Sequence, residues 1–269
     1  ATLQGIIHLL TDREYRVNVI PHISDDMVKR FFEIEFDEWA LKFDTDAIMP
    51  IVNYITQFLA IPMLRNIFVQ KENKITIDEI IDTRKILLIN LAKGKIGEEN
   101  ASFLGSLFMN KIKQAGMARA EFSDDKRKDF HLYFYEFHTV MTGSFINLFS
   151  EARKYGFTIT VAHQYIAQID PNVLATVLGN VGTIIVFRLG GEDAEKLEAE
   201  MTPIFKAKDM INLSTREFYI KETIDGEVYD PFSAETLAVL IPPYASLKEQ
   251  IIAGSRKKYA LRYDENPQH

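Results

Sequence analysis

Polar side chains that could support phosphate chemistry follow two apolar segments between residues 130 and 164. Glu136 comes at the end of the first segment, and His163 and Gln164 come at the end of the second. In an open parallel sheet, ligands bind outside the carboxyl ends of the strands, so we expect these groups to share one crevice. A carboxylate placed there could act as a general base on water, and an amide could orient that water or a terminal phosphate. The pattern favours nucleotide chemistry.

Each of these groups also has a purely structural interpretation. A carboxylate at the end of a buried strand is costly unless a cation or a hydrogen-bond donor meets it. Glu136 could therefore cap a following helix or pair with Arg153. Gln164 could satisfy only the backbone groups at a strand end. The residues alone leave both interpretations open.

Two arginines could reach a transferring phosphoryl group. Arg153 lies at the end of a predicted helix, where the helix dipole favours a cation whatever the function. The alternative is an arginine finger, whose guanidinium stabilises phosphoryl charge in a neighbouring subunit. Arg188, at the end of another apolar run, is a second candidate. Its structural alternative is an ion pair with Glu192 or Asp193.

The sequence gives little support for a metal site, a thiol-dependent site or a Ser-His-Asp hydrolase site. His138 and His163 flank the same predicted crevice, but no Asp, Glu or His stands at helical spacing from them, so no metal site is predicted. The chain has no cysteine, which excludes disulfides, thiol nucleophiles and thiolate metal sites. It also lacks the G-x-S-x-G elbow typical of Ser-His-Asp hydrolases.

Composition predicts a globular protein with a substantial core, because 47% of its 269 residues are hydrophobic. The net charge of −7 argues against a broadly basic surface that coats nucleic acid. No apolar run approaches the roughly 20 residues that span a bilayer, so we expect a soluble chain. The sequence opens on Ala-Thr-Leu-Gln, and we expect a piece of a longer polypeptide. Two basic clusters are expected to be solvated faces or tails: Lys111, Lys113, Arg119, Lys126, Arg127 and Lys128, and Arg256, Lys257, Lys258 and Arg262.

An all-α section is predicted for residues 1–73. Residues 24–68 have helical periodicity, with Ser24-Asp25-Asp26 and Asp44 as helix caps, and Pro50 and Pro62 near helix starts. The single tryptophan, Trp39, is interpreted as a packing residue.

An α/β portion is predicted for residues 74–240, followed by a tail at 241–269. Near-continuous apolar runs typical of strands buried on both faces occupy residues 85–91, 131–137, 157–163 and 183–189. Helices are predicted between them at 98–119, 144–155 and 172–181. This alternation indicates a mostly parallel sheet flanked by helices. Asp225-Gly226 indicates the turn of a hairpin.

The chain resembles the C-terminal half of the motor domain of the HerA/FtsK superfamily, especially conjugative coupling proteins of the TraG/TraD kind and other type IV secretion ATPases. The resemblance runs over residues 12–237. It is carried by KILLINLAKGKIGEENASFLGSLF, HLYFYEFHTVMTGSFINLFSEARKYGFTITVAHQYIAQI, VLGNVGTIIVFRLGGEDAEKL and PFSAETL. It implies a RecA-like P-loop NTPase fold.

The resemblance also implies roles for particular residues. The family's Walker B strand ends in Asp-Glu, where Asp holds magnesium through water and Glu activates the hydrolytic water. Glu136 falls on that Glu, Arg153 on the arginine finger and Gln164 on the sensor glutamine. Tyr135 stands at the Asp position and cannot replace a hard anionic oxygen. We predict that Tyr135 and Arg188 border the nucleotide and that no residue of this chain binds the metal.

The phosphate-binding P-loop of that family is missing. A P-loop requires G-x-x-x-x-G-K-[ST], whose backbone N–H groups cradle the phosphates. The single Gly-Lys pair, Gly94-Lys95, is followed by Ile96. ATP and Mg²⁺ are therefore expected for a complete motor, and the isolated chain is predicted to be inactive.

Two hypotheses follow. The chain is either the C-terminal part of a hexameric, DNA-translocating ATPase that is completed by a P-loop segment, or a non-catalytic module that docks partner proteins or subunits. A generic α/β ligand-binding domain would leave the motif match unexplained. The resemblance implies self-association into a ring, single- or double-stranded DNA, and type IV secretion or relaxosome proteins as partners. It implies a cytoplasmic location at the inner face of a membrane, reached through regions or partners outside this chain.

Overall fold

The computed structural model divides into two compact units. The first comprises Ala1–Thr76, Ala92–Asn100 and Ser246–His269, and the second comprises Ile77–Leu91 and Ala101–Ala245. The predicted division at residues 73 and 240 stays a prediction. The structure describes residues 2–36, 38, 48–70, 72–120, 122–123, 127–140, 143–241, 243 and 245–260. For residues 143–145 it describes the backbone only.

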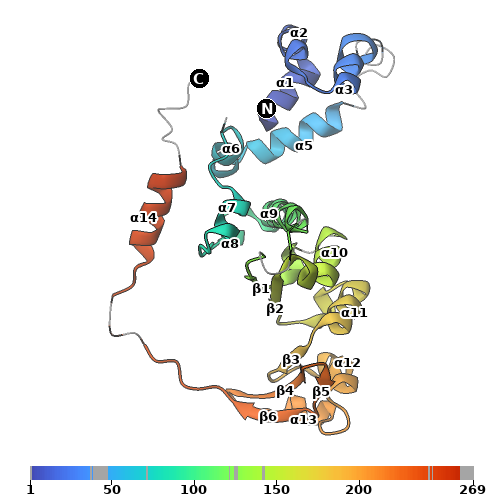
Figure 1. Cartoon of the computed structure of the whole chain (residues 1–269), viewed down its shortest axis with the longest axis vertical. Coiled ribbons are helices and arrows are strands. Elements are labelled where there is room, and N and C mark those ends of the chain that lie inside the picture. The colour runs from blue at the N-terminus through green and yellow to red at the C-terminus, as the bar shows by residue number, and fades with distance from the viewer. Residues whose placement is uncertain are drawn as a thin grey trace. The chain divides into compact units, whose positions relative to one another are not determined.

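The described part of the first unit is helical, which confirms the predicted N-terminal all-α section. Its elements, coloured blue to cyan and red in Figure 1, are α1 (Leu3–Thr11), α2 (Arg13–Val19), α3 (Asp26–Arg30), a π-helical turn (Phe31–Glu35), α5 (Met49–Leu59), α6 (Pro62–Phe68), α8 (Lys93–Ile96) and α14 (Lys248–Tyr259). No helix within the described ranges combines the length and the apolar composition needed to cross a bilayer.

Helix starts in this unit follow the expected local chemistry. The Asp25 carboxylate accepts hydrogen bonds from the backbone N–H groups of Met27 and Val28 and so caps α3. Pro50 and Pro62 lie in the first turns of α5 and α6, where a missing N–H costs nothing. The predictions for Asp44 and Trp39 lie outside the described residues.

The second unit contains the parallel strand pair that the sequence predicts around residue 136. Strands β1 (Phe130–Tyr135) and β2 (Phe157–Ala162) pair in parallel, from Phe130 opposite Phe157 to Tyr135 opposite Ala162. They are connected by a 3₁₀ turn η4 (Phe137–Val140), α10 (Gly143–Glu151) and a second 3₁₀ turn η5 (Ala152–Tyr155). Both strands therefore end at the same edge, and the residues after them become neighbours.

A second sheet in this unit is antiparallel. Strand β3 (Thr183–Val186) pairs with β4 (Glu217–Ile224), which also pairs with β5 (Glu227–Val228) and β6 (Phe232–Glu235). Asp225 and Gly226, both with positive φ, form the predicted turn between β4 and β5. Figure 1 shows this sheet with α12 (Gly191–Met201) and α13 (Ala207–Ile211) in orange. The α/β class is confirmed.

Two predicted strands differ from the structure. The run 183–189 was expected to join the parallel sheet, but the β4 hairpin pairs with it instead, and Ile185 and Phe187 are exposed rather than buried on both faces. Residues 85–91 form no strand in the described structure. Ile86 is 89% exposed and Leu88 is 77% exposed, so these side chains are not buried as the prediction of a strand covered on both faces requires.

The predicted helix 98–119 is present as α9 (Glu98–Arg119), and its glycines permit close packing within the second unit. A Cβ atom on Gly105 would lie 2.4 Å from Val140 Cγ1 and 3.2 Å from Leu91 Cδ1. Val140 ends η4, the turn that begins directly after Glu136. Gly105 thus allows α9 to support the segment that carries the candidate site.

Replacing Gly105 with Ala is expected to lower the free energy of unfolding by about 1–3 kcal/mol, because the added methyl overpacks the contact with Val140. Alanine by itself favours a helix by about 1 kcal/mol over glycine, so the sign of the change is informative. Gly179→Ala in α11 (Pro171–Asn180) is the matched control, because no atom lies within 4 Å of a Cβ built there. Urea unfolding measures both variants, and equal stabilisation of the two would contradict the packing argument.

Candidate functional site

The backbone at the end of β1 turns sharply at Glu136. Glu136 has a φ of +53°, a left-handed conformation that is uncommon for a residue other than glycine. Its N–H donates to the Ala162 carbonyl at 3.0 Å, and its carbonyl accepts from the Thr139 N–H at 3.1 Å and from Thr139 Oγ1 at 3.0 Å. These bonds hold the strained conformation and fix the direction of the Glu136 side chain.

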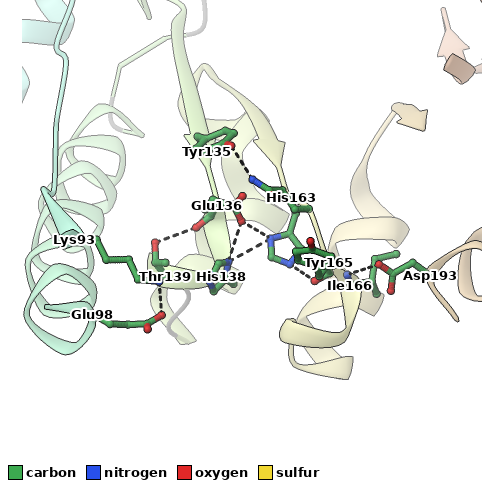
Figure 2. A network of polar contacts seen from close by, with 11 residues as sticks. Lys93, Glu98, Tyr135, Glu136, His138, Thr139, His163, Tyr165, Ile166 and Asp193 are labelled. Carbon is green, nitrogen blue, oxygen red and sulfur yellow. Dashed lines mark hydrogen bonds and ion pairs between the residues drawn. The ribbon is translucent and has the colours of Figure 1, made fainter. Parts of the chain in front are cut away.

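The Glu136 carboxylate lies between two imidazole rings. Its Oε2 atom is 3.3 Å from His163 Nδ1 and 3.5 Å from His138 Nδ1, and the two Nδ1 atoms are 3.3 Å apart. Figure 2 shows these three side chains pointing toward one another from the ends of β1 and β2. The side chains of Glu136, His138 and His163 are 23%, 17% and 7% exposed, so the cluster is largely but not completely buried.

The His163 ring is oriented by two further contacts. Its Nε2 lies in hydrogen-bonding contact with the Tyr165 carbonyl. The Phe137 ring packs edge-on against it, with centroids 5.4 Å apart. The next residue, Ile166, donates its N–H to Asp193 Oδ2 at 3.1 Å, which ties this loop to α12 (Figure 2).

Tyr135 and Gln164 form a second polar pair beside the cluster. Gln164 Nε2 donates to the Tyr135 hydroxyl at 2.9 Å. Tyr135 is 75% exposed, and Gln164 is also exposed. The register of β1 and β2 explains the pairing, because Tyr135 lies opposite Ala162, two residues before Gln164.

The structure brings Tyr135, Glu136 and Gln164 together and places Arg153 elsewhere. Arg153 is exposed in η5, just before β2 begins, whereas Gln164 follows the end of that strand. A six-residue strand spans about 20 Å, so Arg153 and Glu136 do not pair within one chain. The carboxylate has His138 and His163 as neighbours instead.

Arg188 lies two residues beyond β3 and is exposed. It forms no ion pair with any residue that the structure describes. Glu192 pairs with Lys196 at 2.7 Å, and Asp193 accepts from Ile166, so neither forms the ion pair suggested for Arg188. The roles of Arg153 and Arg188 at a nucleotide stay predictions.

The cluster of one carboxylate and two imidazoles was not predicted from the sequence. Metal ligands on a helix recur at helical spacing, whereas these three side chains come from the ends of two parallel strands. Glu136 and His138 are two residues apart at the end of β1, and His163 directly follows the facing strand β2. An E-x-H pattern after one strand and a histidine after its parallel neighbour would have been the signal.

The described residues do not by themselves fit a magnesium nucleotide. Gly94-Lys95 lies inside α8, a four-residue helix that ends at Ile96, and not in a loop between a strand and a long helix. Tyr135 offers a neutral hydroxyl, already bonded to Gln164, where a magnesium site requires an anionic oxygen.

Comparison with known proteins identifies a fold. No family model and no curated protein matches the sequence. Among solved structures, the chain is similar to the plasmid coupling protein TrwB in complex with ADP and Mg²⁺, with a TM-score of 0.54 and 11% identity. The similarity covers 87% of this chain and 57% of that one, so the chain spans little more than half the length of its structural neighbour. At this identity the likeness establishes the fold and not the activity.

Proposed function

We propose that this chain is the C-terminal portion of a hexameric DNA-translocating ATPase of the HerA/FtsK superfamily that serves conjugation or type IV secretion. The observation that carries the proposal is the shared fold with a plasmid coupling protein. A second observation supports it: the parallel pair of β1 and β2 places Glu136 and Gln164 at the same edge of the sheet. We expect that the chain does not hydrolyse ATP alone, because its sequence has no P-loop motif and Tyr135 stands at the position of the magnesium-linked carboxylate.

In this proposal the site is shared between segments and between subunits. Glu136 activates water, and Gln164 orients that water or contacts the terminal phosphate. Arg153, which is exposed and distant from Glu136 in its own chain, acts on a neighbouring subunit as an arginine finger. Tyr135 and Arg188 border the nucleotide. A P-loop segment outside these 269 residues supplies the main contacts to ATP and Mg²⁺.

The partners follow from the same proposal. An arginine that acts in trans requires a neighbouring subunit, which the proposed motor provides by self-association into a ring. The assembly handles single- or double-stranded DNA together with type IV secretion or relaxosome proteins, at the cytoplasmic face of an inner membrane. The net charge of −7 implies that DNA contacts are confined to a local basic surface.

A non-catalytic docking module is the second candidate. It is favoured by the hydrogen bond between Gln164 and Tyr135, which engages the proposed sensor glutamine with the residue that replaces the magnesium carboxylate. The highly exposed apolar side chains of Ile86 and Leu88 would suit a protein partner.

The first test measures magnesium-dependent ATP hydrolysis by the isolated 269-residue chain. No turnover above background is expected, because nothing described in the chain cradles the phosphates. Robust turnover that Glu136→Gln abolishes would overturn the proposal that the chain needs a second segment. Reading the coding DNA upstream separates the two candidates: a P-loop in frame or in an adjacent frame supports the motor, and its absence favours the docking module.

A further inference from the structure

Three atoms that can each donate a lone pair to a metal converge at the end of the parallel strand pair. They are Glu136 Oε2, His138 Nδ1 and His163 Nδ1. From this arrangement we propose that the three residues bind one first-row transition-metal dication of the Zn²⁺ class. The observations that support this site are independent of the proposed function, although an occupied site would use the same Glu136 carboxylate.

The spacing of the three atoms matches a tetrahedral metal. The separations are 3.3 Å, 3.3 Å and 3.5 Å. Zinc holds nitrogen and carboxylate ligands at about 2.0–2.1 Å, which places any two ligands of a tetrahedron about 3.3–3.4 Å apart. An ion just outside the plane of the three atoms would therefore reach all of them without a change of rotamer.

The hydrogen bonding of His163 assigns its proton to the nitrogen that faces away from the cluster. The Tyr165 carbonyl can only accept, so the Nε2 atom against it carries the hydrogen. In the neutral ring, Nδ1 then presents a lone pair toward the Glu136 carboxylate and His138. Two facing lone pairs on His163 and Glu136 repel each other unless a proton or a cation lies between them. A carbonyl bonded to the distal nitrogen is also the usual partner of a metal-binding histidine.

The kinds of ligand select the metal. Imidazole nitrogen suits zinc and its first-row neighbours, whereas Mg²⁺ prefers oxygen ligands in an octahedral arrangement. Two histidines and one carboxylate leave a fourth position for water on a tetrahedral ion. Glu136 and His138 are partly exposed, at 23% and 17%, so solvent reaches part of the cluster.

Glu136 is held ready for this role by its backbone. The left-handed conformation and its three backbone hydrogen bonds fix the carboxylate toward the rings before any ion arrives. Binding then requires little ordering of the first ligand. An occupied site would use Glu136 Oε2 as a ligand, so the metal and a water-activating role of Glu136 would compete.

Titration of the tag-free chain with Zn²⁺ tests the proposal by calorimetry. One ion per chain is expected, and His163→Asn should weaken binding at least about 10-fold because it removes one of three protein ligands. His131→Asn is the matched control, because His131 lies on β1 with an exposed side chain and does not belong to the cluster. Equal affinity of the His163 variant and the wild type would overturn the site, as would displacement of Zn²⁺ by millimolar Mg²⁺.

Cobalt spectroscopy of the unmodified chain gives a result that does not depend on the folding of a variant. Co²⁺ bound by two imidazoles, a carboxylate and water should give the intense visible absorption of a four-coordinate ion. A weak spectrum typical of six-coordinate cobalt, or no uptake at all, would contradict the proposed geometry.

Discussion

Replacing Glu136 with Gln is expected to lower ATP turnover at least about 100-fold in an assembly completed by a P-loop segment, because general-base catalysis contributes that much or more. The amide keeps the shape of the carboxylate but cannot accept a proton from water. Nucleotide affinity should change little, since Glu136 is proposed to act on water and not on the phosphates. Steady-state hydrolysis and equilibrium nucleotide binding measure the two effects.

A matched control for this substitution is Glu195→Gln, on the exposed side of α12. It makes the same chemical change away from the strand ends and should leave turnover unaltered. Unchanged hydrolysis in the Glu136 variant would assign Glu136 to the His138 and His163 cluster alone. A parallel loss of folding, followed by circular dichroism, would instead identify it as a structural residue.

Replacing Arg119 with Ala is expected to lower the free energy of unfolding by about 3 kcal/mol. Arg119 ends α9, is buried, and donates to the carbonyls of Tyr155, at 3.2 Å, and Lys128. Its guanidinium also lies over the Phe157 ring, 5.7 Å from the centroid. Truncation leaves two carbonyls short of a donor and opens a cavity where α9 meets the start of β2.

Burial lowers the pKa of the Arg119 guanidinium, while the carboxylate of Asp82 raises it. Arginine is protonated across the usual pH range, so the effect of the substitution should not depend on pH near neutrality. Arg119→Lys should recover only part of the stability, because an ammonium cannot reproduce the planar fork that reaches both carbonyls.

The control for Arg119 is Lys111→Ala on an exposed position of the same helix, which should alter stability by less than about 0.5 kcal/mol. Urea unfolding followed by circular dichroism compares the variants. A loss of similar size at both positions would show that truncating a long side chain on α9, and not the anchoring by Arg119, decides the result.

Arg119 belongs to a cluster of basic residues whose predicted exposure to solvent is only partly correct. The sequence grouped it with Lys111, Lys113 and Arg127 in a basic cluster expected to be solvated. In the structure Arg119 is buried, and Arg127 donates to the carbonyls of Ala120 and Lys154. These two arginines serve the packing of the second unit, because their long side chains reach backbone oxygens brought near by the fold.

The local elements were predictable because short-range chemistry decides them. The bounds of α9, the Asp25 cap of α3, the prolines of α5 and α6, and the Asp225-Gly226 turn follow from propensity and backbone geometry within a few residues. The strand pairing of β3 was not predictable in this way. An apolar run predicts a buried strand but does not identify its pairing partner. Whether β3 pairs with β2 or with β4 depends on tertiary packing.

The sequence by itself determined the α/β class, the helical front section and the presence of Glu136 and Gln164 at the ends of neighbouring parallel strands. The period and length of the apolar runs contain that information. Only the tertiary structure decided that Glu136 meets His138 and His163 and that Arg153 lies at the opposite end of β2. Contacts between side chains depend on register, on the left-handed turn at Glu136 and on the loop held by Asp193, which residue spacing does not reveal.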